Sequence, residues 1–262
     1  MKKIFLLLAF TFTALMANAW DKVCDEAAVI LASQHLTPEA KNVVDKYLGS
    51  EYNDDVQYLY ALEKTNIATH SKEIHYLHLD KKLKPKKCKE GDAYAAINEA
   101  LKVVKAHESQ SPENVTAALR TIINLMCDMH CLSNIRIDKI PHSKYDFEYL
   151  RIVAEYGKKK DSTAKARWSK TWSGFNYPSG FSAAYRAYDM KLCLDNRYAE
   201  ITKGTLADWA SDNGKIAAHY LEICKPDVTV SYMDYMMRED VSYDMLIKAG
   251  CRLAALLNEN LK

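Results

Sequence analysis

Residues 111–131 read SPENVTAALRTIINLMCDMHC, and this stretch decides the fold. Ser111 is a suitable N-cap, Pro112 fits the first helical turn, and Glu113 complements the positive end of the helix dipole. Apolar side chains then recur at helical spacing, at Val115, Ala118, Leu119, Ile122, Ile123, Met126 and Met129. The pattern predicts a long amphipathic helix at the centre of a helical bundle.

Helix signals recur on both sides of this stretch. Thr37-Pro38-Glu39 opens a helix that ends before Gly49, and Asp92 caps another that runs through Val104. Ser242 is the predicted cap of the last helix, whose apolar period is kept by Met245, Leu246, Ala249, Leu253, Leu256 and Leu257. Weaker helical patterns cover residues 24–35, 56–64 and 206–223.

The region between residues 135 and 198 is less regular. We expect one helix near residues 147–156, a basic loop at Lys158-Lys159-Lys160, and irregular structure in the remainder. No run alternates apolar and polar residues between turn signals, and only 8 glycines and 6 prolines punctuate the chain. The predicted fold class is therefore all-α, with one multi-helix domain over residues 20–262.

The first 19 residues are expected to be a signal peptide. Met1-Lys2-Lys3 is cationic, residues 4–16 are apolar apart from two threonines, and Ala17-Asn18-Ala19 supplies the small residues of a cleavage site. The apolar stretch is shorter than the roughly 20 residues that span a bilayer, so no stable membrane anchor is predicted. The mature chain would begin at Trp20 and be secreted or periplasmic.

Net charge and cysteine content bound the environment of the protein. A formal net charge of +2 gives no global preference for nucleic acid or an anionic membrane. All seven cysteines follow residue 19, so in an exported chain they would meet conditions in which disulfides persist. Because their number is odd, at least one thiol stays unpaired within the chain, and the sequence leaves the pairing open.

The central helix carries the first candidate site. Asn124 and Asp128 lie one turn apart, so their side chains project from the same face and could meet a metal or a substrate. They could equally be exposed or hydrogen-bonded inside a bundle. Cys127, His130 and Cys131 lie beside them, but a metal site normally gathers ligands from several elements. We therefore expect both thiols in disulfides or in the core.

A second imidazole cluster lies at His75-Tyr76-Leu77-His78, with His70 shortly before it. Such histidines serve either as ligands or as packed, hydrogen-bonded side chains. The sequence has no G-x-S-x-G elbow and no glycine-rich phosphate loop, so neither serine nucleophile chemistry nor a phosphate-binding loop is indicated.

Two basic stretches complete the candidates. Residues 81–87 are lysine-rich, and residues 158–170 are basic with Trp168 and Trp172 beside them. Interleaved basic and aromatic residues can hold a single-stranded phosphate backbone while its bases stack. The alternative interpretation of both stretches is a solvated loop.

Several motifs, spread over most of the chain, carry a family resemblance. They are Leu36-Thr37-Pro38-Glu39-Ala40, His75-Tyr76, residues 118–130, Asp208-Trp209-Ala210-Ser211 and the closing residues 249–258. Together they resemble the zinc-dependent single-strand nucleases of the fungal S-one/P-one type, which share their helical fold with zinc phospholipase C. The closing stretch is the most specific of these matches.

The resemblance implies a fold of the phospholipase C/nuclease type and zinc-dependent phosphodiester hydrolysis, with single-stranded nucleic acid or nucleotides as partners. Mature members begin with a tryptophan whose amino group and carbonyl bind zinc, a role that falls on Trp20. His75 matches a histidine ligand of the family. Asp128 matches the aspartate that bridges two zinc ions, which makes it the expected catalytic residue.

Several positions depart from the family pattern. Asp25 stands where the family has a histidine, Asn124 replaces the first histidine of the central helix, and Asn134 replaces a later one. The Trp-Ala-Asp element reads Tyr60-Ala61-Leu62, so its aspartate is missing and Glu63 is the nearest carboxylate. If Trp172 matches the last ligand motif, its histidine and aspartate are replaced by Ser169 and Ser173.

These substitutions limit the metal site, because amide and hydroxyl groups are poor zinc ligands. The resemblance implies at most a partial zinc site formed by Trp20, Asp25, His75 and Asp128. Glu63 and Asn124 are weaker members of this set. One zinc ion is conceivable at such a site, whereas three are not expected.

Three functions remain open at this point. The first is a nuclease-family protein with impaired catalysis or none, that is, a pseudoenzyme. The second is an active phosphoesterase with a reduced zinc site. The third is a non-catalytic periplasmic binding module in which the basic segments near Lys84 and Lys160 contact an anion or a partner.

Overall fold

The computed structural model describes residues 20–49, 72–89, 91–140, 145–155, 158–172 and 182–262. The helices are α1 (Lys22–Ser33), α2 (Pro38–Leu48), α4 (Ala93–Lys105), α5 (Pro112–Asp128), α6 (Trp168–Thr171), α7 (Ala183–Leu194), α8 (Tyr198–Ile201), α9 (Leu206–Ile223) and α10 (Tyr232–Asn260). Short 3-10 helices are η2 (Lys72–His75), η3 (His107–Ser109) and η4 (Leu132–Asn134). The strands are β1 (Leu77–Leu79), β2 (Ile135–Ile137), β3 (Asp146–Glu155), β4 (Lys158–Arg167) and β5 (Thr229–Val230).

Helix caps explain where the predicted helices begin. Ser111 accepts a hydrogen bond from the Asn114 amide at the start of α5, and Asp92 does the same for the Ala95 amide in α4. The side chain of Thr37 caps α2. The predicted helices at residues 37–49, 92–104, 111–129 and 206–223 are all confirmed.

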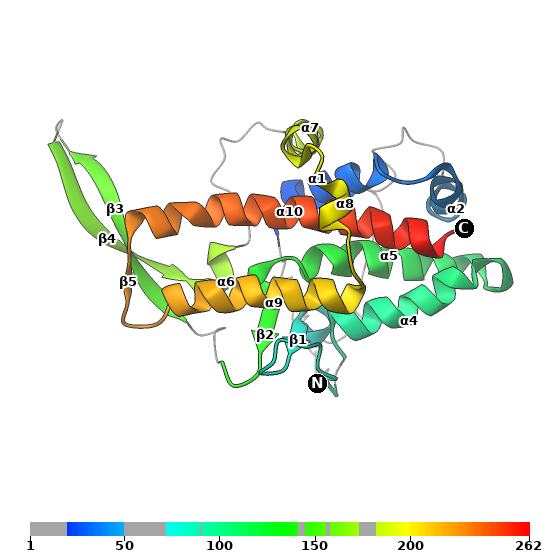
Figure 1. Ribbon diagram of the computed structural model, residues 1–262, viewed down its shortest axis with the longest axis horizontal. Helices are drawn as coiled ribbons and strands as arrows, with labels where there is room; N and C mark the ends of the chain where they lie inside the picture. The colour runs from blue at the N-terminus through cyan, green and yellow to red at the C-terminus, as the bar shows by residue number, and fades with distance from the viewer. Residues whose placement is uncertain (1–19, 50–71, 90, 141–144, 156–157, 173–181) are drawn as a thin grey trace, which may run out of the picture.

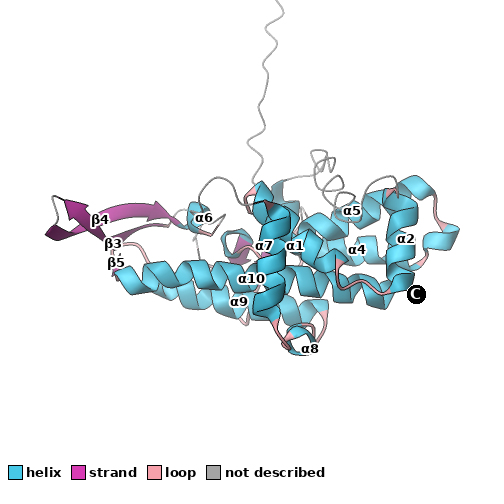
Figure 2. Ribbon diagram, turned by 90° about the horizontal axis from the view of Figure 1, so that it is seen from above, coloured by secondary structure: helices cyan, strands magenta, loops and turns pink. Residues whose placement is uncertain are grey.

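The helices enclose one core around α1, α5 and α10. Helix α4 packs on α5, while α1 packs against both α7 and α10. Figure 1 shows α10 running along the longest dimension of the molecule with α9 beside it, and Figure 2 shows α7 and α1 together from above. The apolar stripe of α5, from Val115 to Met126, is buried in this core. The fold is thus mainly α, and the predicted all-α class is confirmed only in part, because the described residues also form two small sheets.

A β-hairpin corrects the prediction for residues 147–160. Strands β3 and β4 pair antiparallel from Asp146–Arg167 to Glu155–Lys158, and β5 joins β3 in parallel. The predicted helix and the predicted basic loop were therefore wrong. Aromatic side chains favour a strand here, because Phe147 is buried and Tyr149 stacks on Tyr235 at 3.6 Å between ring centroids. Figure 1 shows the hairpin at one end of the molecule.

Helix α10 begins earlier than the sequence pattern predicts. Its cap is Ser231, which accepts a hydrogen bond from the Asp234 amide at 3.1 Å, whereas Ser242 is buried within the helix. The apolar period starts only near Met245 because the first turns extend beyond the core to the hairpin. Met233 and Met237 in these turns are exposed.

The seven cysteines form no disulfide in the structure. The expected disulfides are therefore not found. For Cys127 and Cys131 the alternative expectation is confirmed, because both thiols are buried in the core. Among the described residues, no helix combines the length and apolar character needed to cross a membrane. The predicted signal peptide at 1–19 and the helix at 56–64 lie outside the described residues.

Candidate metal centre

The centre of the candidate site is a pair formed by His75 and Asp128. Asp128 is the last residue of α5 and His75 the last of η2, and their Nδ1 and Oδ2 atoms lie 2.7 Å apart. The hydrogen bond to Asp128 raises the pKa of His75, although burial opposes this shift. Burial raises the pKa of Asp128, while His75 acts in the opposite direction. The pair therefore retains its protons to higher pH than the free groups.

A second carboxyl group, Asp25, lies in the first turn of α1, close enough to Asp128 to interact with it electrostatically. Burial raises its pKa well above the usual value, and the next largest cause is the charge of Asp128. The Oδ1 atom of Asp25 is buried and has no hydrogen-bond partner among the described residues. A buried acid whose ionisation is opposed by the charge of a second acid is a group that a cation would stabilise.

Trp20 fixes the chain just before α1 to the same turn of α5. Its indole is fully buried, and Nε1 donates a hydrogen bond to the carbonyl of Cys127 at 3.1 Å. The Trp20 indole is thus bonded to the residue that directly precedes Asp128 in α5. The structure therefore brings the segment at residues 20–25 close to Asp128, which also contacts His75, although the three segments are far apart in the sequence.

The two asparagines at family ligand positions play different roles. Asn124 donates through Nδ2 to the Arg120 carbonyl of its own helix at 2.9 Å. Asn134, in η4, donates to the carbonyl of His75 at 3.1 Å and lies 3.5 Å from Asp128 Oδ1. Sequence reasoning treated Asn134 only as a lost ligand, but the residue positions the His75–Asp128 pair. The sequence signal that could have indicated this role is the position of Asn134, where the family has a histidine ligand.

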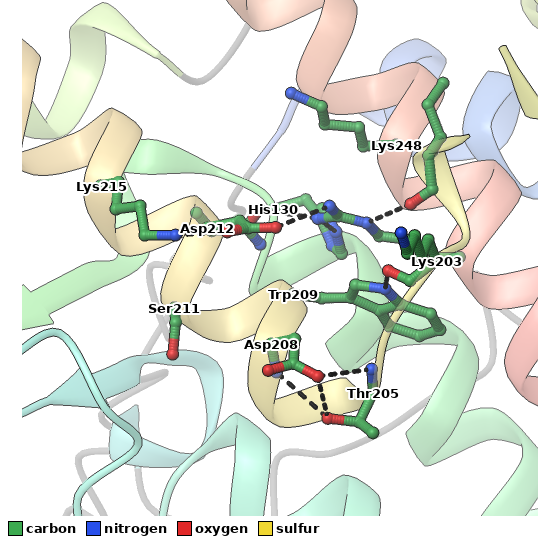
Figure 3. Close-up of polar contacts among 12 residues, drawn as sticks. His130, Lys203, Thr205, Asp208, Trp209, Ser211, Asp212, Lys215 and Lys248 are labelled. Carbon is green, nitrogen blue, oxygen red and sulfur yellow. Dashed lines mark hydrogen bonds and ion pairs between the residues drawn. The ribbon is translucent and has the colours of Figure 1, made fainter. Parts of the chain in front are cut away.

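His130 belongs to a separate buried network, part of which Figure 3 shows. Its Nδ1 lies 2.7 Å from the Met126 carbonyl, and its Nε2 lies 3.2 Å from a guanidinium nitrogen of Arg252. Because arginine only donates, Nε2 is the acceptor and Nδ1 carries the proton. Burial lowers the pKa of His130 well below its usual value, and Arg252 lowers it further. His130 is therefore a neutral structural residue here.

The Asp208-Trp209-Ala210-Ser211 motif is also structural. Asp208 and Thr205 form a reciprocal capping box at the start of α9, and the Trp209 indole donates to the Lys203 carbonyl at 3.0 Å (Figure 3). Ser211 bonds back to its own helix at the Ala207 carbonyl. The motif thus begins and anchors α9 rather than contributing to the His75–Asp128 site.

The remaining predicted residues fall elsewhere. Glu63, His70 and Ser173 lie outside the described residues. Trp168 and Trp172, proposed from the sequence as stacking partners for bases, are fully buried and pack on each other at 5.3 Å between ring centroids. They do not present aromatic faces for a single-stranded nucleic acid.

The raised pKa of Asp25 predicts a pH dependence of stability. Folded Asp25 holds its proton more tightly than the unfolded residue, whose pKa is about 4, so the free energy of unfolding falls as pH rises above that value. Each pH unit up to the folded pKa costs about 1.4 kcal/mol for such a group. We expect Asp25→Asn to reduce this loss between pH 5 and pH 8, as measured by urea denaturation with a chelator present.

An exposed carboxylate on α10 provides the matched control. Asp240→Asn should leave the slope of stability against pH as it is in the parent protein. If the free energy of unfolding falls equally steeply with pH in Asp25→Asn and in the parent, ionisation of folded Asp25 does not cause the loss of stability.

Comparisons with known proteins add no family assignment. No protein-family model matches the sequence, and no match to a curated protein is found.

Proposed function

We propose that this protein binds one divalent cation of the zinc class at Asp25, His75 and Asp128, and that Trp20 completes the site. In this proposal the chain is an exported protein of the phospholipase C/nuclease type, secreted or periplasmic, in which phosphodiester hydrolysis is impaired. The observation that carries it is the buried Oδ1 of Asp25, which has no hydrogen-bond partner among the described residues and belongs to a carboxyl group that interacts electrostatically with Asp128 of the His75–Asp128 pair.

The chemistry of the donor set suits one cation, and the side chains would have to close on it, because the ligand atoms of Asp25, His75 and Asp128 do not all lie within 4.8 Å of one another in the structure. Asp25 and Asp128 supply carboxylate oxygens and His75 supplies an imidazole nitrogen, which are ordinary zinc ligands. A divalent cation would also offset the penalty that the charge of Asp128 places on the ionisation of Asp25. The resemblance adds the amino group and carbonyl of Trp20, whose indole is already fixed against α5.

A set of three cations does not fit. At the family positions of further ligands, the Asn124 amide donates to Arg120 and the Asn134 amide to His75. His130 is neutral and directed at Arg252. Zinc in such sites supplies Lewis-acid stabilisation of a phosphodiester and its leaving oxygen. With one cation instead of three, most of this stabilisation is lost, which is why we propose impaired hydrolysis.

The residues of the site have distinct roles in this proposal. Asp128 and Asp25 hold the positive charge, and the raised pKa of each acid makes binding weaker at low pH. Asn134 orients His75 and Asp128 through its amide. Single-stranded nucleic acid and nucleotides are the substrates to test first, because the resemblance implies them.

The test uses protein that begins at Trp20, prepared metal-free and then supplied with zinc. We expect Asp128→Asn to bind one zinc equivalent fewer than the parent protein and the control Asp240→Asn to bind as much zinc as the parent, measured by elemental analysis after gel filtration. A version with an added methionine before Trp20 should bind zinc at this centre more weakly, because the Trp20 nitrogen is then part of a peptide bond and no longer a free amino group. Circular dichroism establishes that each variant is folded.

Activity distinguishes the alternatives. We expect the parent protein to cleave single-stranded DNA and a phosphomonoester no faster than the Asp128→Asn variant does. Zinc-dependent cleavage that chelation and Asp128→Asn both abolish would instead establish an active phosphoesterase with a reduced site. Zinc content that is unaffected by Asp128→Asn would disprove the proposed centre.

A further inference from the structure

A second set of potential ligands lies on the other side of β1. In this strand Leu77 and Leu79 are buried, so the alternation of a strand directs His78 to the opposite face. The Nε2 of His78 lies 2.9 Å from Glu73 Oε2. One ligand atom each from Glu73, His78 and Cys88 lie within 4.8 Å of one another.

Backbone contacts hold Cys88 in this position. The loop after β1 folds back so that the Lys86 amide donates to the His78 carbonyl at 2.9 Å, and the Asp80 amide donates to the Lys84 carbonyl. The Lys86 ammonium pairs with Asp138 at 3.0 Å, which ties the loop to the residue after β2. The loop therefore returns Cys88 to the side of the strand where His78 lies.

We propose that Glu73, His78 and Cys88 bind a divalent cation of the zinc class, at a site separate from the Asp128 centre. The thiolate and imidazole select zinc over magnesium or calcium, which prefer oxygen ligands. Ligand atoms around tetrahedral zinc stand roughly 3.3–3.7 Å apart, as Zn–N and Zn–S distances of about 2.0 and 2.3 Å require. Small side-chain rotations bring the three atoms to these separations.

A buried carboxyl group, Asp92, lies close enough to His78 to interact with it electrostatically. Asp92 is 1% exposed and caps α4 through the Ala95 amide at 2.7 Å. Burial raises the pKa of Asp92, while the nearby His78 acts in the opposite direction. A carboxylate beside a ligand histidine is the usual second layer of a zinc site, where it orients the ring.

The surroundings indicate what the fourth ligand would be. The three residues line a pocket of about 510 Å³ whose wall also carries basic side chains, namely Lys86, Lys87, Lys89, Arg136 and Lys139. A zinc ion with three protein ligands keeps a position for water or another small ligand. Because the wall is basic, a small anion with a phosphate or carboxylate group is the ligand class that this position favours.

Cobalt(II) is the probe that separates this site from the Asp128 centre. Cobalt bound by a thiolate gives an intense near-ultraviolet charge-transfer band, which oxygen and nitrogen ligands alone do not give. We expect the reduced parent protein to show this band, Cys88→Ser to lose it, and Asp128→Asn to retain it. The control Cys193→Ser, which removes an exposed thiol on α7, should also retain it.

Zinc affinity provides the second measurement, by competition with a chromophoric chelator. His78→Ala and Cys88→Ser should each weaken binding at this site by roughly 100-fold, and Glu73→Gln by about tenfold. Because the two sites are separate, a protein that carries both Asp128→Asn and Cys88→Ser should lose the zinc of both sites. A band that persists in Cys88→Ser, or a parent protein without a band, overturns this site whatever happens at Asp128.

Discussion

Replacing Arg252 by methionine is expected to lower the free energy of unfolding by roughly 3–5 kcal/mol, the usual loss when one partner of a buried charged network is removed. The Nε of Arg252 donates to the Ile201 carbonyl, and its Nη1 donates to both His130 Nε2 and Asn213 Oδ1. These contacts tie α10 to the loop after α5, to α8 and to α9. Methionine fills similar space but donates nothing.

Two opposing effects decide the size of this loss. Burial lowers the pKa of Arg252 to about 10, so removing the guanidinium recovers part of its desolvation cost. Three buried acceptors are then left without a donor, and each costs about 1–3 kcal/mol. The second effect is larger, because Asn213 is fully buried and water does not reach these groups readily.

Arg197 supplies the control for this prediction. It pairs with Asp244 at 3.1 Å near the surface, so Arg197→Met should cost at most about 1 kcal/mol. Urea denaturation followed by circular dichroism measures both variants. If they differ by less than 1 kcal/mol or so, the Arg252 network does not stabilise the fold as argued.

Replacing Gly250 by alanine is expected to lower the free energy of unfolding by about 2 kcal/mol. A β-carbon at this position of α10 would lie 2.7 Å from the Ala28 carbonyl oxygen and 3.1 Å from Leu31 Cδ2, both on α1. Such overpacking costs up to about 3 kcal/mol, while alanine recovers about 1 kcal/mol of helix propensity. The loss remains because the nearest atom belongs to the backbone of a packed helix and cannot rotate away.

Gly214 in α9 is the matched comparison. A β-carbon there would come within 2.3 Å of the terminal methyl of Leu79, which is buried but is the end of a side chain and not backbone. Because this methyl group can rotate aside, Gly214→Ala should cost less than Gly250→Ala, about 1 kcal/mol. Thermal and urea denaturation of both variants test the difference. Equal effects would mean that α1 shifts as easily as the Leu79 side chain.

The sequence predicted the elements whose signals are local. The caps at Thr37, Asp92 and Ser111, together with the apolar stripes that follow, determined three helices because hydrogen bonds and periodicity act within one segment. The hairpin at residues 146–167 escaped prediction, since its stability depends on partners such as Tyr235 in a distant helix. Tertiary contacts decide such segments.

The candidate site also contains residues that the sequence identified and one whose role it did not reveal. The pattern identified His75 and Asp128, which the structure brings into contact, and Asp25, which interacts electrostatically with Asp128. It did not identify the positioning role of Asn134, because that role depends on a hydrogen bond to a residue 59 positions earlier. The sequence also treated His75 and His78 as one cluster, whereas the structure directs them to different sites.

The packing of α1 against α10 has a consequence for how the chain folds. These helices come from opposite ends of the described sequence, and α1 also carries Asp25 and follows directly on Trp20. Contacts of such large sequence separation slow folding, because the closure entropy of the intervening chain must be overcome before they form. During synthesis the emerging chain would hold an unfinished core until α10 is available to pack on α1. Assembly of the proposed metal centre, which includes Asp25 of α1, would then be a late event of folding.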